Sequence, residues 1–423
     1  MSYDLIIKLP LEGSLIRELT VSAIAAIYRN AEKLLRSEEY SLKYNEEYVI
    51  LSLENLYSWN QVLYTTLRSS VSTLKIKSTV LRAPKLHVND LNYVFKKFNA
   101  FMASGSTYID GFLKALTVHG PNVFNYDTVK THYSVIEFKK GMLVYGIGKT
   151  YPLVQIFKVE LYETATDFHR PSTVPFKTKL SLPWYILLGI GFAISYAGMF
   201  GNQVLFITPS EEVLETPPEV RDALALTLGA TFSRRIADPI IPYQLYLALT
   251  LPEMVQSRIL VKHIKENYSA GRELLEGLYS FLLGDHEYEE FEKKSVEGSV
   301  PKINIHRITI GRAYTSVERA SIDLSYLAKF AYILEHYAEK EKSPKCREIL
   351  RDKIVARGIG GIDPKIMNVL TLLYETIHGA KDPRYVLYYL LRTISDRGIQ
   401  IDKGCVSALI KTLEDTCGFK VYE

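Results

Sequence analysis

Cysteine is scarce in this chain. Its 423 residues include only Cys346, Cys405 and Cys417. They form no Cys-x-x-Cys pair and are too few for a disulfide framework, so we expect unpaired thiols in a reducing cytoplasm. The first 15 residues contain Asp4 and Glu12 and lack an uninterrupted apolar run. No secretory signal peptide is therefore expected.

Sequence motifs of catalysis are also lacking. There is no His-Glu-x-x-His, no Gly-x-Ser-x-Gly and no complete phosphate-binding loop. We therefore expect no metal site and no cofactor, and favour a protein without catalytic activity. A nuclease is the alternative, because Asp167 and His169 share one connecting segment and an acidic run spans 285–292.

Glutamine is rare too, with six residues, whereas tyrosine occurs 30 times and charged residues make up 23% of the chain. Few thermolabile side chains beside many ionic ones are typical of proteins from thermophiles. The hydrophobic fraction of 47% is ordinary for a globular protein, and the length suffices for two or three domains.

Charge is absent from one long stretch, residues 180–210. Pro183 suits the first turn of a helix that continues to about Gly198. Residues 204–207 then predict a buried strand. The stretch divides the chain into two parts with different patterns.

This stretch could cross a membrane, since the 18 residues from Pro183 to Phe200 would span about 27 Å as a helix. We favour a core helix instead. Gly191, Ser195 and Gly198 are small enough to let a neighbouring backbone approach closely, and helices that are apolar all round are expected inside large proteins.

The part before this stretch mixes helix and strand patterns. Residues 13–37 and 54–74 predict helices, and Asn89 is the expected cap of a third helix ending near Ala103. Strands are predicted at 133–138, 142–146 and 153–161. Between the first two strands, Lys139-Lys140-Gly141 predicts a hairpin tip, with Gly141 at positive φ.

The part after the stretch reads as almost wholly helical from Glu211 onward. One helix carries a seam of apolar residues at alternating steps of three and four, which is typical of a bundle. The seam consists of Leu324, Leu327, Ala331, Leu334 and Ala338. We predict an α+β protein: a mixed α/β domain over 1–210, followed by an α-helical bundle over 211–423.

Positive charge is concentrated between residues 60 and 140, where 11 basic residues face 4 acidic ones, a net charge of +7. Basic residues alternate there with apolar and aromatic ones, and this combination suits phosphate contacts and base stacking. A solvated lysine face over core aromatics explains the pattern equally well. The candidate nucleic-acid-binding residues are Lys75, Lys77, Arg82, Lys85, Lys96, Lys97, Lys139 and Lys140.

In layout, size and composition the chain resembles the large subunit of archaeal CRISPR surveillance complexes of subtype I-A. The resemblance covers the order of a mixed N-terminal region with a basic segment, an apolar helix–strand block at 183–207 and a helical C-terminal half. It includes no signature motif, so no functional residue is transferred from the family.

The resemblance implies a non-catalytic, cytoplasmic protein of antiviral defence. Its partners would be guide RNA, the flanking motif of target DNA and other subunits of the complex, and it would help to recruit a helicase–nuclease. Two alternatives remain besides a nuclease: a helical scaffold, and a protein anchored in a membrane through residues 180–210.

Overall fold

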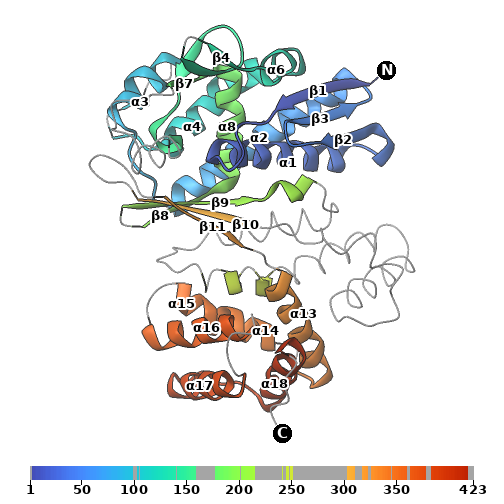
Figure 1. Cartoon of the computed structure of the whole chain (residues 1–423), viewed down its shortest axis with the longest axis vertical. Coiled ribbons are helices and arrows are strands. Elements are labelled where there is room, and N and C mark those ends of the chain that lie inside the picture. Colours follow the sequence, from blue (N-terminus) through green and yellow to red (C-terminus); the bar gives the residue numbers. More distant parts are fainter. Residues whose placement is uncertain are drawn as a thin grey trace. The chain divides into compact units, whose positions relative to one another are not determined.

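The structure is a computed structural model of the chain, and Figure 1 shows its elements in sequence colours. It describes residues 2–98, 102–103, 105–139, 141–158, 177–200, 202–214, 241, 244–246, 248–250, 303–309, 317–322, 325–343, 345–359, 363–377 and 383–417. The chain forms two compact units. The first comprises Met1–Glu215 and Lys302–Ser321, and the second Thr216–Pro301 and Ile322–Glu423. Mixed strands and helices in the first unit and helices in the second confirm the predicted α+β class.

The described part of the first unit contains three β-sheets. Their strand orders are β1-β3-β2, β4-β5-β7-β6 and β11-β10-β9-β8. Strands β5 and β7 pair in parallel, whereas the pairs β1–β3, β2–β3, β4–β5, β6–β7, β8–β9 and β9–β10 are antiparallel. The strands are β1 (Tyr3–Lys8), β2 (Tyr40–Tyr44), β3 (Tyr48–Leu53), β4 (Ile136–Lys139), β5 (Met142–Tyr145), β6 (Thr150–Pro152), β7 (Lys177–Ser181), β8 (Tyr196–Phe200), β9 (Gln203–Pro209), β10 (Ile303–Thr309) and β11 (Val317–Ile322).

Seven helices accompany these sheets in the described residues. They are α1 (Leu15–Leu34), α2 (Leu56–Val80), α3 (Val88–Tyr93), α4 (Tyr108–Val118), α5 (Gly120–Val123), α6 (Tyr126–Tyr133) and α8 (Leu182–Ser195). The two longest begin at side-chain caps: Ser14 accepts from the backbone N–H of Arg17 at 3.1 Å, and Asn55 accepts from that of Ser58 at 2.7 Å. The helices predicted at 13–37 and 54–74 are thus confirmed.

The helix predicted from Asn89 to about Ala103 is confirmed only as α3, which ends at Tyr93, and residues 99–101 lie outside the described residues. His87 is the N-cap of α3, and a 3₁₀ turn, η2 (Phe95–Phe98), follows the end of α3. A 3₁₀ turn places residues i and i+3 on one side, so it turns both phenylalanines at its ends into the core. The strand predicted at 153–161 is also misplaced, because β6 ends at Pro152 and another 3₁₀ turn, η3 (Gln155–Phe157), follows.

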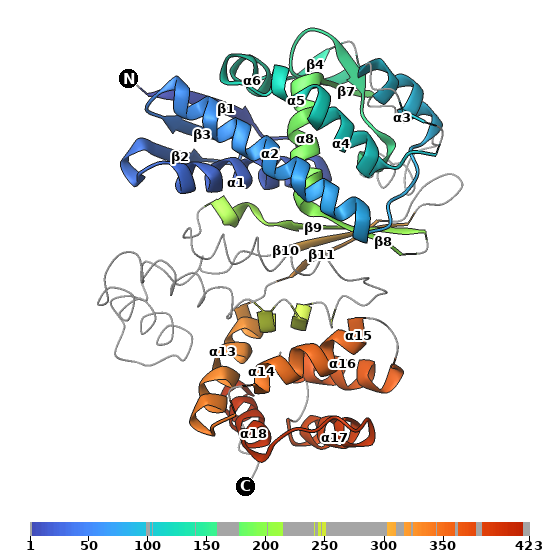
Figure 2. The same cartoon turned by 180° about the vertical axis from the view of Figure 1, so that it is seen from behind.

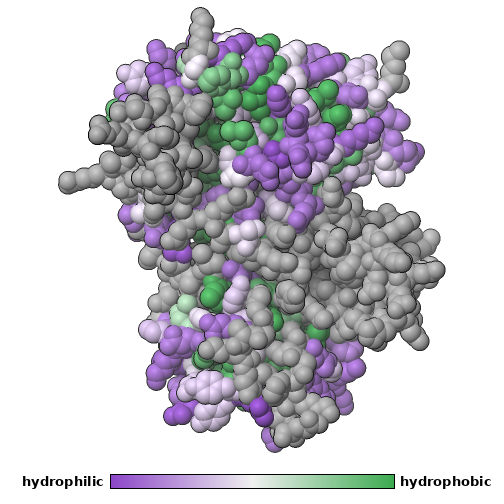
Figure 3. All heavy atoms as spheres, in the orientation of Figure 1, coloured by the Kyte–Doolittle hydropathy of each residue, from purple (hydrophilic) through white to green (hydrophobic). Residues whose placement is uncertain are grey.

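Helix α8 is the centre of the first unit. It packs against α1, α2, α4 and α6, and its large side chains are buried. Around it lies a cluster of aromatic rings with centroids 4.7–6.3 Å apart, which includes Phe112, Phe157, Phe192, Tyr196 and Phe206. On the face of the first unit drawn in Figure 3, by contrast, hydrophilic side chains alternate with smaller apolar areas.

Helices α1 and α8 approach each other at small residues, as the sequence predicted. A Cβ atom on Gly191 would lie 2.1 Å from the backbone oxygen of Leu19. One turn further along, Ser195 Oγ donates to Ser22 Oγ at 3.0 Å. The predicted role in close backbone packing is therefore confirmed for Gly191 and Ser195. It is wrong for Gly198, which lies in β8 and whose added Cβ would meet only a Leu81 methyl group at 3.6 Å.

The apolar helix is shorter than a bilayer-spanning segment. α8 ends at Ser195 after 14 residues, and the chain continues directly into β8 and then β9. Among the described residues, no helix combines the length and the apolar character that a membrane crossing needs. The predicted strand at 204–207 is confirmed within β9.

The second unit is described mainly through its C-terminal helices. These are α13 (Ser325–Lys340), α14 (Cys346–Glu348), a π-helical segment η6 (Ile349–Val355), α15 (Ala356–Ile359), α16 (Pro364–Ile377), α17 (Pro383–Asp396) and α18 (Lys403–Cys417). Helix α13 packs against α18. The buried residues Leu327, Ala331, Leu334 and Ala338 confirm most of the predicted seam, and Leu324 lies outside the described residues.

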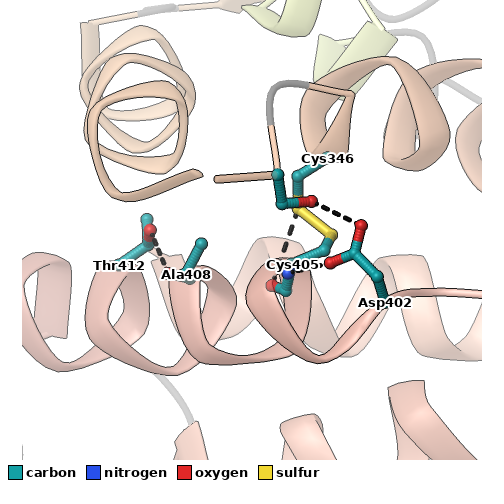
Figure 4. The surroundings of a disulfide bond; sticks show 6 residues. Cys346, Asp402, Cys405, Ala408 and Thr412 are labelled. Carbon is teal, nitrogen blue, oxygen red and sulfur yellow. Dashed lines mark hydrogen bonds between the residues drawn. A yellow bond between two sulfur atoms is a disulfide. The ribbon is translucent and has the colours of Figure 1, made fainter. Parts of the chain in front are cut away.

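A disulfide joins Cys346 in α14 to Cys405 in α18 (Figure 4), with 5.1 Å between their Cα atoms. The expectation of unpaired thiols is therefore wrong for these two residues. Asp402 caps the start of α18 beside the bond, accepting from Cys405 N at 2.6 Å and from Ser343 Oγ at 2.8 Å. Local patterns do not predict this pair, because 59 residues separate its members.

The almost wholly helical pattern predicted after Glu211 is wrong at 303–309 and 317–322. There β10 pairs with β9 over its full length, from Ile303 opposite Pro209 to Thr309 opposite Gln203, and β11 follows β10 at the sheet edge. The chain therefore returns to the first unit, and a single boundary at residue 210 does not describe it.

Candidate nucleic-acid interface

The predicted basic residues between 75 and 97 follow the C-terminal end of α2 and the segment that leads to α3. Figure 2 shows this segment running along one side of the first unit. Its backbone is fixed: Leu86 N donates to Ser106 O at 2.8 Å, and Tyr108 N donates to Pro84 O at 3.1 Å. Lys85 forms a β-bridge with Thr107. Backbone hydrogen bonds therefore hold this segment in a defined path, and such a segment can present side chains at fixed positions.

Lys77 is not available to a ligand. It is 3% exposed, and its Nζ donates to the backbone carbonyls of Ile194 at 3.0 Å and Tyr196 at 2.8 Å. Burial lowers the pKa of the Lys77 amine well below its ordinary value. The sequence placed this lysine on a binding surface, but it caps the C-terminal end of α8 instead.

The other basic residues of this group are exposed: Lys75, Arg82, Lys85, Lys96 and Lys97. Lys96 and Lys97, here called the lysine pair, lie in η2 between Phe95 and Phe98. These two phenylalanines are 0% and 2% exposed. These two phenylalanines are therefore core residues, and of the aromatics near the pair only Tyr93, which is 58% exposed, is available among the described residues for stacking.

The carboxylates of this region are engaged within the fold. Asp90 is 2% exposed and accepts hydrogen bonds from Tyr108 Oη and, at 2.9 Å, from the backbone N–H of Gln155. Burial raises the pKa of Asp90, and these two hydrogen bonds oppose the rise. Asp110 closes the capping box of α4 with Thr107. Asp90 is therefore buried, whereas Asp110 is exposed and binds Thr107, the β-bridge partner of Lys85.

The hairpin tip contributes less than the sequence suggested. β4 and β5 form the predicted hairpin, with Gly141 at a φ of 72°, as a tight turn requires. However, exposed Lys139 pairs with Glu137 of its own strand. Lys140 lies outside the described residues. Asp167, His169 and the run at 285–292, considered for a nuclease, also lie outside them.

Sequence reasoning missed the outward face of α2 before Lys75. Tyr57 and Tyr64 are 78% and 59% exposed, and Arg68 lies one turn further along the same face. A signal was present, because none of the 25 residues of α2 is acidic. A charge count over residues 60–140 averages over several elements and therefore does not reveal a single helix face.

Within the described residues, no group of three or more histidine, cysteine or acidic side chains is arranged to hold a metal ion. No family model matches the chain, and a search of curated proteins finds no match either.

Proposed function

We propose that this chain is a nucleic-acid-binding protein that contacts phosphates through Lys75, Arg82, Lys85, Lys96 and Lys97. The observation that carries the proposal is the exposure of these five cations along one fixed backbone path, while the carboxylates of the same region are buried or used as helix caps. Lysine and arginine displace the counterions of a phosphate backbone, and this supplies most sequence-independent affinity.

The finer proposal follows from the resemblance in layout. The chain would be the non-catalytic large subunit of a CRISPR RNA-guided surveillance complex. It would contact guide RNA and the flanking motif of target DNA, and help to recruit a helicase–nuclease. The protein would then act in the cytoplasm, where guide RNA is assembled with its other subunits.

Binding of fluorescently labelled RNA and DNA oligonucleotides, measured at several salt concentrations, tests the first proposal. The variant Lys75→Glu/Arg82→Glu/Lys85→Glu should bind about tenfold more weakly or worse, and the slope of log affinity against log salt should fall by about 2 to 3. Lys77 is left intact, because its substitution would disturb the core.

The matched control reverses three exposed lysines of the second unit, Lys345→Glu/Lys353→Glu/Lys365→Glu, which changes the net charge equally. It should bind within about threefold of the unaltered protein. An equal loss of affinity in both triple variants would show that net charge, and not this site, determines binding. Unchanged binding in the first variant would refute the assignment of the site.

The finer proposal is tested by purification of the chain from cells that also express a guide RNA and the other subunits of a type I-A complex. A short RNA and those subunits should be recovered with it. Recovery of the chain alone would contradict the CRISPR assignment while leaving nucleic-acid binding intact. Metal-dependent cleavage by the purified chain, abolished by Asp167→Ala, would instead establish a nuclease.

A further inference from the structure

Helix α2 has two sharply different faces. Its inward face is formed by buried residues, which are Trp59, Val62, Leu63, Thr66, Leu67, Ser70, Leu74 and Lys77. Its outward face consists of exposed residues that recur at steps of three and four, which are Tyr57, Gln61, Tyr64, Arg68, Ser72, Lys75 and Thr79. The outward face thus carries two aromatic rings, two cations and no carboxylate.

The order of these residues matters as much as their identity. Tyr57 and Tyr64 stand at the N-terminal end of the face, and Arg68 and Lys75 continue it toward the basic segment that begins with Arg82. Figure 2 shows α2 at the front of the first unit, with its C-terminal end beside β8. The face and the basic segment are therefore continuous along the backbone.

We infer that the outward face of α2 binds single-stranded nucleic acid, with bases stacked on Tyr57 and Tyr64 and phosphates held by Arg68 and Lys75. This rests on the proposed function and names the form of nucleic acid that the first unit takes. Exposed aromatic rings stack on unpaired bases, whereas a duplex keeps its base faces inside its own stack and offers a tyrosine its backbone and the base edges in its grooves.

The dimensions fit one strand. Seven helical residues separate the tyrosines by about 10 Å, or about three nucleotide steps of a stacked strand. From Tyr57 to Lys75 the face is about 27 Å long, which corresponds to about eight nucleotides. An occupant of this length lies within the ordinary range for single-strand sites.

Three variants of the full chain separate stacking from other roles of the tyrosines. Tyr57→Ala/Tyr64→Ala removes both rings, and Tyr57→Phe/Tyr64→Phe keeps the rings but removes the hydroxyls. The control, Tyr385→Ala/Tyr388→Ala, removes two tyrosines of α17 in the second unit that are 55% and 59% exposed. All four side chains lie on helix surfaces, so circular dichroism and thermal unfolding should be unchanged in each variant.

Binding is measured by fluorescence anisotropy with labelled 20-nucleotide oligo(dT) and oligo(rU) and with a 20-base-pair DNA duplex. The affinity of the alanine pair for the preferred single strand should be at least about tenfold lower than that of the unaltered protein. Its affinity for the duplex should stay within about threefold. The phenylalanine pair and the α17 pair should bind the single strand within about threefold. The oligonucleotide that binds with the higher affinity identifies the strand as DNA or RNA.

Three results would overturn the inference. These are unchanged single-strand binding by the alanine pair, an equal loss on the duplex, and an equal loss in the α17 control. If the unaltered protein binds the probes and the alanine pair binds the single strand equally well, this inference falls while the proposed function stands. If the unaltered protein binds neither single strands nor duplex, both fall together.

Discussion

Lys77 in α2 donates a hydrogen bond from its Nζ to the backbone carbonyl of Tyr196 at 2.8 Å, and a second to that of Ile194 at 3.0 Å. The Nζ of a lysine carries at least two N–H groups, so it can donate to both carbonyls at once. The last carbonyls of a helix have no partner within the helix, so a side chain from another element is well placed there. This lysine joins α2 to the C-terminal end of α8.

The substitution Lys77→Glu should lower the free energy of unfolding by about 3 kcal/mol or more, because it places an acidic group against two carbonyl oxygens without water. Lys75→Glu, two residues earlier on the exposed face, should change it by less than about 0.5 kcal/mol. Denaturant unfolding of both variants measures the difference. Equal stabilities would show that Lys77 is not buried.

The stability of the protein should rise with pH in the alkaline range because of Lys77. Burial lowers the pKa of this amine in the folded state, so between that value and the ordinary 10.5 the unfolded chain holds a proton that the folded chain lacks. Unfolding then becomes less favourable as pH rises through this window. Lys77→Met should flatten the dependence, which unfolding curves at pH 7 to 10 would show. A slope identical to that of the unaltered protein would contradict this explanation.

Reduction of the disulfide should destabilise the second unit. The Cys346–Cys405 bond closes a loop across 59 residues, and its loss should lower the free energy of unfolding by about 4 kcal/mol in the chain-entropy model. Cys346→Ser/Cys405→Ser should match the reduced protein, whereas Cys417→Ser should resemble the unaltered one. Three reactive thiols in denatured, unreduced protein would mean that the bond does not form.

Gly191→Ala should be severely destabilising, by about 3 kcal/mol or more, because the new methyl group would overlap backbone atoms of Leu19. Gly189→Ala on the same helix is the control. Its Cβ would come within 3.1 Å of a Leu116 methyl group, and this flexible side chain can move aside. The melting temperature of Gly189→Ala should therefore be well above that of Gly191→Ala. The reverse order would argue against close packing of α1 and α8.

Acid should weaken the attachment of α1 to the turn at Glu211. Burial on its own would raise the pKa of Glu211, but hydrogen bonds from Arg17 and Tyr44 outweigh it and hold the pKa below the ordinary 4.5. The folded state therefore gains stability above pH 4.5 and loses it as pH falls through the lowered pKa.

Glu211→Gln should remove this acid dependence and lower the free energy of unfolding at pH 7 by about 2 kcal/mol. Exposed Glu12→Gln is the matched control and should leave both unchanged. Unfolding curves between pH 3 and 7 make the comparison. An acid profile of Glu211→Gln as steep as that of the unaltered protein would assign the effect to other carboxylates.

Much of the fold was predictable from local patterns. The caps at Ser14 and Asn55, the positive φ of Gly141 and the seam of α13 depend on residues close in sequence. Long-range partners were not predictable. The burial of Lys77 depends on a helix end more than 100 residues away, and the pairing of Cys346 depends on α18. Apolar alternation also fails to show which strand of a distant segment will join a sheet.

The candidate site was predicted only in part for the same reason. Counting charge between residues 60 and 140 found the basic segment, but a count does not distinguish Lys75 on the surface from Lys77 in the core. Helical spacing would have done so, since Lys77 shares its face with buried Leu74 and Ser70. The same spacing also predicts that Tyr57 and Tyr64 lie on the exposed face of α2.

The pairing of β9 with β10 has a consequence for synthesis on the ribosome. Pro209 leaves the ribosome 94 residues before its partner Ile303, which corresponds to about 5 to 20 seconds of translation. During that interval one edge of β9 has no β10 beside it, and such an edge can pair with other nascent chains. The time at which the first unit can complete its sheet therefore depends on the rate of translation. Until then, the unpaired edge of β9 must be kept from other strands.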